Sequence, residues 1–168
     1  YILIFLITIT SQFYISFFSK HLGDLGMDNA TVSWITLLSV LAELPFLYFG
    51  DRIARWTNIW NWLLIGAIAN GVRWLGLALS RSALAIILFQ IPGVTVLACF
   101  EFFPALYLAR RVAPELSGAA QSVLTLTTFG AAKIIGSLLG GVICEYTGIP
   151  ALMAFNGAAL LVGSIAIY

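Results

Sequence analysis

Residues 59–79 have the sequence IWNWLLIGAIANGVRWLGLAL, a largely apolar run in which Arg73 is the only charged side chain. A helix of about 20 apolar residues crosses a hydrocarbon core about 30 Å thick. Five other runs of this kind lie at about residues 1–19, 31–49, 83–108, 117–142 and 150–168. The sequence therefore predicts an all-α fold, a polytopic transmembrane bundle of six helices.

The composition supports a membrane protein and excludes an ordinary soluble domain. Hydrophobic residues make up 61% of the chain and charged residues 9%, and the mean hydropathy is +1.03. Soluble domains are about 45–50% apolar and about 25% charged. A soluble fold must wet its outer surface, whereas a bundle surrounded by lipid can expose apolar side chains. The net charge of +1 does not suggest nucleic-acid binding.

The sequence carries no signature of enzyme chemistry. His21 is the only histidine, and no spacing of cysteines or histidines is typical of a metal site. Cys99 and Cys144 lie in or beside apolar runs, and we interpret both as small packing residues. No Gly-x-x-x-x-Gly-Lys loop that would hold ATP phosphates occurs. We therefore expect neither catalysis nor a metal or cofactor.

Positive charge is distributed unevenly over the connections between the apolar runs. The second and fourth connections hold four arginines, whereas the other three hold only Lys20 and Arg81. The four arginines are Arg52, Arg55, Arg110 and Arg111. Because short cytoplasmic connections are enriched in Lys and Arg, we expect these two connections and both chain ends on the cytoplasmic side of the cell (inner) membrane. The chain begins at Tyr1 without methionine, so we also expect it to be a piece of a longer protein.

A weak internal echo suggests a repeat of three helices. The second apolar run closes with Leu47-x-x-x-Asp51-x-x-Ala54, and the fifth closes with Gly141-x-x-x-Glu145-x-x-Gly148. An odd number of spans inverts the second copy relative to the first. Inverted three-helix repeats are typical of transporter folds. The alternative is a chance similarity between two helix ends.

Four ionisable residues lie inside the predicted spans: Glu43, Arg73, Glu101 and Lys133. A charge at the bilayer centre costs about 2.5–3.5 kcal/mol on insertion scales, so such residues should face the bundle interior and one another. A rise of 1.5 Å per residue places Glu43 and Lys133 near mid-depth and Glu101 nearer the cytoplasmic side. The alternative role is structural ion pairing that fixes the helix register.

Proton coupling is the functional hypothesis for these charges. A carboxyl group that gains and loses a basic neighbour as the protein moves can bind and release a proton. Glu43 fits this role best, with Arg73 and Lys133 as the modulating cations. Glu101 is either the alternative proton site or a residue that lines a wet inner mouth. Three neutral polar residues, Gln12, Asn70 and Gln90, also lie inside spans. They can hydrogen-bond a polar substrate, although joining helices is the commoner role.

The whole chain resembles the C-terminal six-helix half of a major facilitator superfamily transporter. Asp51-Arg52-Ile53-Ala54-Arg55 is similar to the cytoplasmic signature of that superfamily, with Leu47 and Ala54 at positions that are usually glycine. Residues 114–121 resemble the entry to its eleventh helix, and the glycine pattern of residues 136–148 resembles the exit. The resemblance implies a twelve-helix transporter whose N-terminal half lies on the same longer chain.

Within that superfamily, Glu43, Arg73 and Lys133 fall on the helices that carry Glu, Arg and Lys in oligosaccharide–proton symporters. The phenylpropionate permease-like and nucleoside–proton symporter groups look similar too. The chain has Gln90 but departs from their patterns at Pro92, where a histidine is usual, and at Thr95, where lactose permease has a carboxylate. The resemblance thus implies a proton symporter in which Glu43 is the coupling residue.

We therefore expect half of a secondary active transporter. It would move a small organic solute, such as a sugar, nucleoside or aromatic acid, by alternating access with protons. A proton-driven exporter of drugs or metabolites remains an alternative. A membrane scaffold or receptor that transports nothing is an alternative of another class, and it would tolerate neutralisation of all four intramembrane charges.

Overall fold

The computed structural model describes residues 2–167, with the side chains of all but 2–4, 6, 7, 13–15, 97, 98, 100, 129, 166 and 167. Every element in residues 2–167 is helical. The elements are α1 (Ile2–Asp24), α2 (Asn29–Tyr48), α3 (Gly50–Ile53), α4 (Ile59–Leu79), α5 (Ala83–Gln90), α6 (Val94–Leu97), α7 (Phe103–Arg111), α8 (Pro114–Thr125), α9 (Ala132–Thr147) and α10 (Ile149–Ile167).

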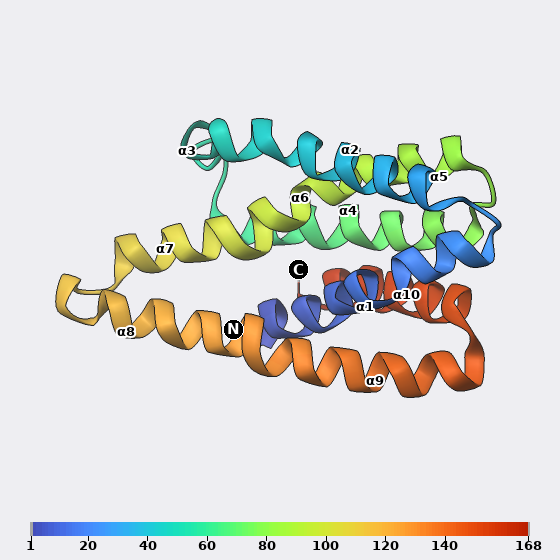
Figure 1. The fold of residues 1–168 in the computed structure, drawn as a ribbon. Coiled ribbons are helices and arrows are strands. Elements are labelled where there is room, and N and C mark those ends of the chain that lie inside the picture. The colour runs from blue at the N-terminus through green and yellow to red at the C-terminus, as the bar shows by residue number, and fades with distance from the viewer. Residues whose placement is uncertain (1, 168) are drawn as a thin grey trace.

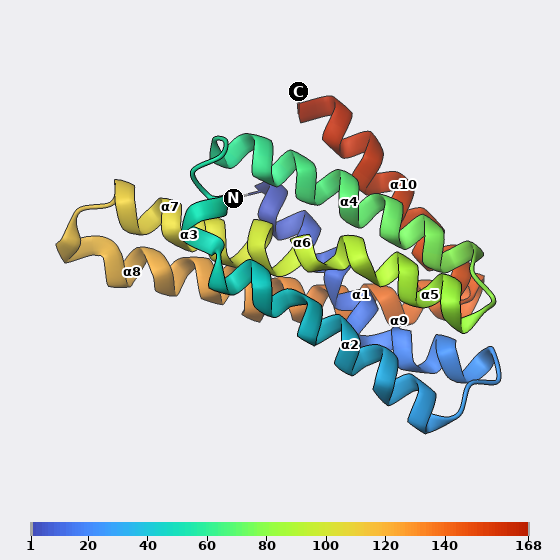
Figure 2. The same ribbon diagram turned by 90° about the horizontal axis from the view of Figure 1, so that it is seen from above.

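The connections alternate between the two ends of the bundle. The α1–α2, α4–α5 and α9–α10 connections lie at one end, and α3 and the α7–α8 connection lie at the other (Figures 1 and 2). An ion pair between Arg110 and Asp51, with Nη2 3.8 Å from Oδ1, ties the second connection to the fourth. The arginine-bearing connections therefore share one end of the bundle, which we call the arginine end.

Helix ends follow local chemistry. The Asn58 side chain accepts a hydrogen bond from the Asn61 N–H at 2.9 Å and so caps the first turn of α4. Ser82 caps α5 in the same way through the Ala85 N–H. Gly148 ends α9 with φ +79°, a conformation that glycine adopts without strain. α1 continues to Asp24, beyond the predicted span 1–19, because its last turn buries His21 and Leu22.

The stretch predicted as one helix at 83–108 is a bent path. After α5, a 3₁₀ turn spans Ile91–Gly93, and a π-helical turn spans Ala98–Phe102 between α6 and α7. A second π-helical turn, Leu126–Ala131, joins α8 to α9. Pro92 accounts for the first irregularity, because proline cannot donate the helical hydrogen bond. The two π turns each place one extra residue in the helix.

The tightest helix contact joins α4 to α10, which run antiparallel (Figure 1). A Cβ atom on Gly71 would lie 2.8 Å from Leu161 Cγ and 3.1 Å from the Gly157 carbonyl oxygen. A Cβ on Gly157 would lie 2.7 Å from Leu75 Cγ and 2.9 Å from the Gly71 carbonyl oxygen. The contact is reciprocal, because each glycine receives the leucine four residues beyond the other. Small residues thus let the two backbones approach closely.

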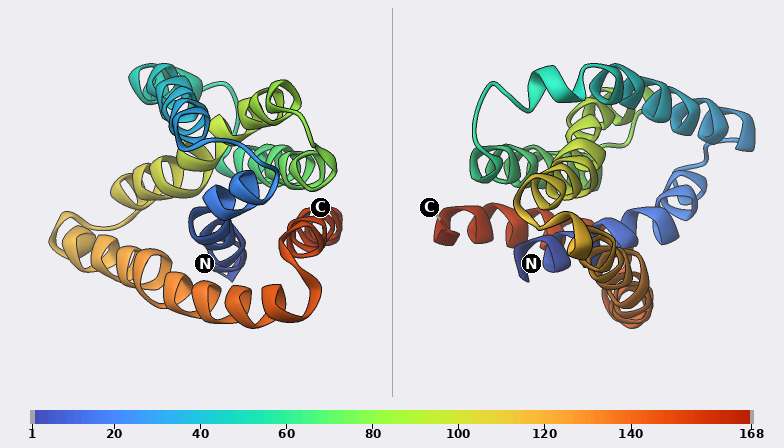
Figure 3. Two further views of the ribbon diagram at one scale, coloured as in Figure 1. Left: turned by 45° about the vertical axis from the view of Figure 1, so that its right-hand side comes forward. Right: turned by 90° about the vertical axis from the view of Figure 1, so that its left-hand side faces the viewer.

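Burial differs strongly among the apolar helices. Within the described residues, three helical stretches are long and apolar enough to cross a membrane: Asn29–Tyr48, Ile59–Leu79 and Pro114–Thr147. Shorter apolar helices span Ala83–Val96 and Ile149–Ile165. More than half of the most apolar window of α4 is buried, whereas α2 stands at one edge with most of its large apolar side chains exposed (Figure 3). Such exposure is normal for a surface that faces lipid.

Candidate functional site

Arg73 is the most deeply buried of the four intramembrane charges. Its side chain on α4 is 6% exposed, and its Nε and Nη2 atoms donate hydrogen bonds to Gln90 Oε1 at 3.1 and 2.6 Å. Gln90, the last residue of α5, is buried as well. A buried guanidinium must be hydrogen-bonded, because desolvating an uncompensated charge is costly. Gln90 therefore fixes the position of Arg73 and joins α5 to α4. This is the helix-joining role that the sequence also allowed for Gln90.

Gly93 provides the space that the Arg73 guanidinium occupies. A Cβ at residue 93 would lie 2.7 Å from Arg73 Cζ and 2.8 Å from Nε. The 3₁₀ turn that begins after Gln90 brings this glycine against the arginine. The Pro92-Gly93 pair thus shapes a recess for Arg73 as well as bending the helix. The sequence contained the pair, but nothing in it indicated which side chain the glycine would contact.

The four charges form a continuous electrostatic chain. Glu43 on α2 interacts with Arg73, Glu101 interacts with Lys133, and the two carboxylates interact with each other. Glu43, Glu101 and Lys133 are all partly buried. The order is therefore cation, carboxylate, carboxylate, cation, from α4 through α2 and the α6–α7 path to α9. Lys133 thus interacts with Glu101, the carboxylate on the α6–α7 path.

Both members of the Glu101–Lys133 couple lie at π turns. Glu101 is within the π turn Ala98–Phe102, and Lys133 is the second residue after the π turn Leu126–Ala131. One extra residue rotates the following helix face by about 100° relative to a regular helix. The depths that the sequence analysis assigned to Glu101 and Lys133 assumed regular helices, so they did not include this rotation. π turns also occur frequently at functional sites.

The remaining polar residues inside the predicted spans lie at helix interfaces. Gln12 packs against the Gly136 face of α9, with its Nε2 donating to Ser16 Oγ at 3.2 Å and its buried Oε1 lacking a described partner. Asn70 on α4 is fully buried, and neither of its amide atoms has a hydrogen-bond partner among the described residues. Buried amides of this kind call for an explanation, such as an ordered water or a ligand.

The three residues of the signature between the second and third predicted spans are all exposed. Asp51 pairs with Arg110 of the fourth connection, and both side chains are largely exposed. Arg52 and Arg55 are exposed. No cluster of three potential metal ligands occurs among the described residues. The site is thus an electrostatic and hydrogen-bonding one, centred on α2, α4, the α6–α7 path and α9.

Comparison with known proteins gives the site a context. Residues 1–155 match the model of the MFS_1-like family. Putative nucleoside transporter YegT of Escherichia coli (strain K12) is 26% identical over 147 residues, which are 84% of this chain and 34% of YegT. The crystal structure of nucleoside transporter NupG (D323A mutant) superposes with a TM-score of 0.79 and 18% identity, over 99% of this chain and 47% of NupG. The chain thus spans between a third and half of the length of these transporters, and the NupG likeness shows that it has the fold of roughly half a transporter.

Proposed function

This chain belongs to the MFS_1-like family, a family of membrane transporters and not of enzymes, and we propose that it forms the C-terminal half of a secondary active transporter. In this proposal all six apolar runs cross the membrane, and a second six-helix half supplies the opposite wall of a central cavity. The exposed apolar side chains of α2 support the proposal, because they need lipid or another protein surface to cover them. Both ends of the segment are proposed to be cytoplasmic, from the four arginines at the arginine end.

We infer that the two three-helix units, α1–α4 and α5–α10, are inverted repeats. The pattern Asn-Gly-x-x-x-Leu occurs at residues 70–75 in α4 and again at residues 156–161 in α10. The two copies of this pattern make the reciprocal glycine–leucine contacts between antiparallel helices. A local two-fold axis perpendicular to the helices relates such contacts, as the inverted repeats of transporters require. This pattern is a stronger signal than the echo between residues 47–54 and 141–148.

The observation that carries the transport proposal is the electrostatic chain of four intramembrane charges. A scaffold has no need of two carboxylates and two cations that interact electrostatically inside the membrane. Each carboxylate disfavours the charged form of the other, whereas a nearby cation favours it, so movement of either cation changes how readily a proton binds. We propose that Glu43 binds the coupling proton beside Arg73, and that Glu101, which interacts with Lys133, adjusts the proton affinity of Glu43.

Nucleosides are the proposed substrate class, because YegT and NupG are described as nucleoside transporters. The buried amide of Asn70 and the Gln12 carbonyl oxygen, which lack described partners, are the candidate hydrogen-bonding groups for such a solute. Sugars and aromatic acids remain substrates to be compared with nucleosides in the same assay.

The test uses the full-length protein that contains this chain, reconstituted into proteoliposomes. Uptake of radiolabelled uridine is measured with and without an imposed inward proton gradient, with glucose and phenylpropionate as comparison solutes. Glu43→Gln should retain solute exchange, since exchange needs no net proton movement, and should lose accumulation against a gradient. Glu101→Gln should be milder if Glu101 only adjusts Glu43.

Four outcomes of this assay decide the proposal. Normal uphill accumulation by well-expressed Glu43→Gln protein eliminates Glu43 as the proton-binding group. Loss of uphill transport in Glu101→Gln alone moves the proton to the π turn at residues 98–102. Flux that survives neutralisation of all four charges would remove the electrostatic chain from the transport mechanism, whereas a protein without flux for any solute would favour a scaffold.

A further inference from the structure

His21 is a buried titratable side chain that the proposed transport mechanism does not use. It lies in the last turn of α1, beyond the predicted span 1–19, and it is 3% exposed. One ring N–H donates a hydrogen bond to the carbonyl oxygen of Leu77, in the last turn of α4, where carbonyl groups have few partners within the helix. Because Nε2 is buried without a hydrogen-bond partner among the described residues, the donor is Nδ1. The histidine thus ties the end of α1 to the end of α4.

The neutral form of the ring fits this position, whereas the protonated form does not. Protonation places a second N–H, on Nε2, where the described residues offer no acceptor, and it brings a positive charge into a buried site. Burial lowers the pKa of His21 below its ordinary value of 6.5 and outweighs the Leu77 carbonyl and Asp24, which raise it. A pKa that is lower in the folded protein means that the contact stabilises the fold above about pH 6.5 and loses this contribution as the pH falls.

The surroundings of the ring hold one charge that acts on it, that of Asp24, which lies in the same turn of α1 and is exposed. α10, which packs against α1 and α4, has no titratable side chain in residues 149–167. The other titratable side chains at this end lie at the surface or around a pocket: Lys20, Asp28, Arg81, Cys144, Glu145 and Tyr146. Burial, the Leu77 carbonyl and Asp24 therefore determine how the ring responds to pH.

The end of α1 has open space on its other side. A pocket of about 360 Å³ separates it from the end of α9. Lys20 and Asp24 line the pocket from α1, and Cys144 and Glu145 line it from α9. Loss of the His21 contact to α4 therefore leaves the last turn of α1 with room to move.

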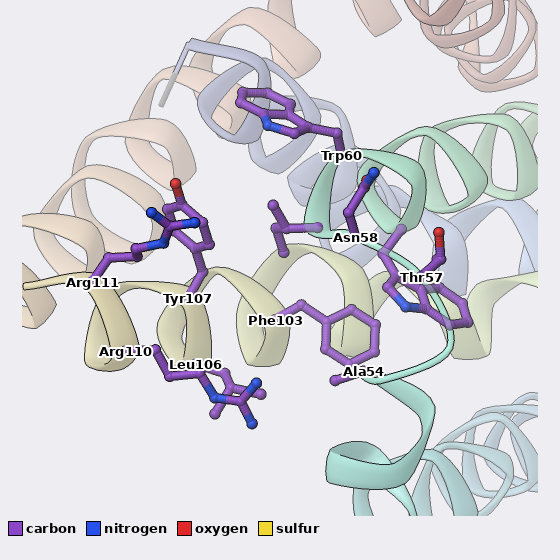
Figure 4. Close-up of a pocket in the computed structure, with 11 residues that line it drawn as sticks. Ala54, Thr57, Asn58, Trp60, Phe103, Leu106, Tyr107, Arg110 and Arg111 are labelled. Carbon is purple, nitrogen blue, oxygen red and sulfur yellow. The ribbon is translucent and has the colours of Figure 1, made fainter.

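The arginine end has no histidine, since His21 is the only one in the chain. A pocket of about 390 Å³ lies there between the start of α4 and α7, and Figure 4 shows the Arg110 and Arg111 side chains on opposite sides of α7. The titratable side chains that line it, Tyr107, Arg110 and Arg111, are exposed, and an arginine keeps its charge at every physiological pH. Histidine is the side chain whose charge ordinarily changes in mild acid, so this response is confined to the opposite end.

We propose that His21 is a pH-sensitive latch, which holds the end of α1 against α4 while the ring is neutral and releases it when the ring is protonated. In the proposed orientation this end faces the outside of the cell, so the latch responds to the external pH. Acid outside then loosens the outer end of the bundle, on the side from which a proton symporter takes up its protons. The latch is a contact within this chain, and its test needs no measurement of transport.

The experiment measures amide hydrogen exchange in the purified full-length protein at about pH 7.5 and about pH 5. Labelling times are scaled for the intrinsic pH dependence of exchange, and peptides from the first half of α4 are the internal reference. Relative to that reference, exchange in residues 18–25 should rise at least about threefold at the lower pH. Equal protection of residues 18–25 at both pH values would overturn the latch.

Two substitutions of the histidine separate its hydrogen bond from its titration. His21→Asn keeps an N–H near the position of Nδ1 and does not titrate, so residues 18–25 should stay protected at both pH values. His21→Phe fills the site without a donor, so it should raise exchange at both pH values. A pH response of wild-type size in His21→Asn would overturn the proposal, and this variant decides the question if His21→Phe does not fold.

A second pair of variants tests the charge that acts on the ring. Asp24→Asn removes a carboxylate that favours the protonated ring, so the midpoint of the exchange change should move to lower pH. Glu145→Gln removes the same charge from the same pocket and should leave the midpoint in place. Equal shifts in the two variants would overturn the latch in favour of a general effect of surface charge.

Discussion

The helices α2 and α4 have similar lengths and apolar compositions, yet they differ strongly in how much of each is buried. In their most apolar windows, 56% of the α4 residues are buried against 6% of the α2 residues. Each helix also carries one charge of the electrostatic chain, Arg73 on α4 and Glu43 on α2. α4 packs largely against other helices of this chain, whereas most of α2 is left for lipid or another protein surface to cover. In the proposed transporter, α4 would belong to a fixed frame, and α2 would face what surrounds this half.

The largest expected effect comes from removing the buried charge on the fixed helix. Arg73→Ala leaves Glu43 and Gln90 without their cation, so we expect a loss of about 3–5 kcal/mol in stability. Glu43→Gln on the exposed helix should cost less than about 1 kcal/mol. The double variant should be less damaged than Arg73→Ala alone, because it leaves no unpaired carboxylate at residue 43. Thermal unfolding and the yield of folded protein measure these differences, and strictly additive losses would show that the two side chains are not coupled.

The next effect concerns the close contact between α4 and α10. Gly157→Ala puts a Cβ 2.9 Å from the Gly71 carbonyl oxygen, so the backbones must separate. We expect a loss of about 1–3 kcal/mol, seen as a lower thermal unfolding temperature. Gly163→Ala on the same helix has open space around its Cβ and is the matched control. It should be neutral or slightly stabilising, and equal destabilisation by the two variants would show that glycine flexibility rather than close packing matters in α10.

A smaller effect is expected at the recess that holds Arg73. Gly93→Ala brings a Cβ to 2.7 Å from Arg73 Cζ. The far end of an arginine can shift, so we expect a loss of about 1 kcal/mol, from a weakened Arg73–Gln90 hydrogen bond. Gly118→Ala, with open space around it, is the control for the added methyl group. In a Gln90→Ala background the Gly93→Ala effect should shrink, and an unchanged effect would separate the recess from the hydrogen bond.

The mildest test labels the two ends of the bundle. A cysteine at residue 58, at the arginine end, should resist membrane-impermeant maleimide in intact cells, and a cysteine at residue 28, at the opposite end, should react. The structure places these positions at opposite ends of α2 and α4 but leaves the direction to the charge distribution. Permeabilised cells provide the control for accessibility. The reverse labelling pattern would invert the proposed orientation without altering the comparison between α2 and α4.

The sequence predicted the features that depend on composition along the chain. Apolar length and the charges between the apolar runs predicted the helices and their alternation, because these signals are local. The π turns at residues 98–102 and 126–131 were missed, since no residue pattern marks them and they shift which side chains face one another. The Arg73–Gln90 bond and the Gly93 recess were missed for a related reason. The Arg73–Gln90 bond joins residues that are 17 positions apart in the sequence. The Gly93 recess depends on a bend whose direction a single sequence does not reveal.

The sequence contains one repeated pattern whose structural meaning could be recognised only from the structure. The Asn-Gly-x-x-x-Leu pattern of residues 70–75 recurs at residues 156–161, and its meaning became visible once the two glycines were seen in contact. Repeats are most easily detected where the same packing constraint requires the same residue type in both copies. Close backbone approach imposes that requirement more strictly than a loop between helices does.

The reciprocal contact between α4 and α10 is isologous in the sense used for symmetric dimers: glycine meets leucine, and leucine meets glycine, across one axis. Such an interface is self-complementary, because each three-helix unit carries both the glycine and the leucine that make the contact. A fragment ending after α4 would therefore present a Gly71–Leu75 face that fits a second copy of itself. Because the contact is antiparallel, two copies inserted in a membrane in the same orientation cannot form it. We therefore expect that fragment to pair through the surface that α10 covers only in detergent, where two copies can meet in opposite orientations.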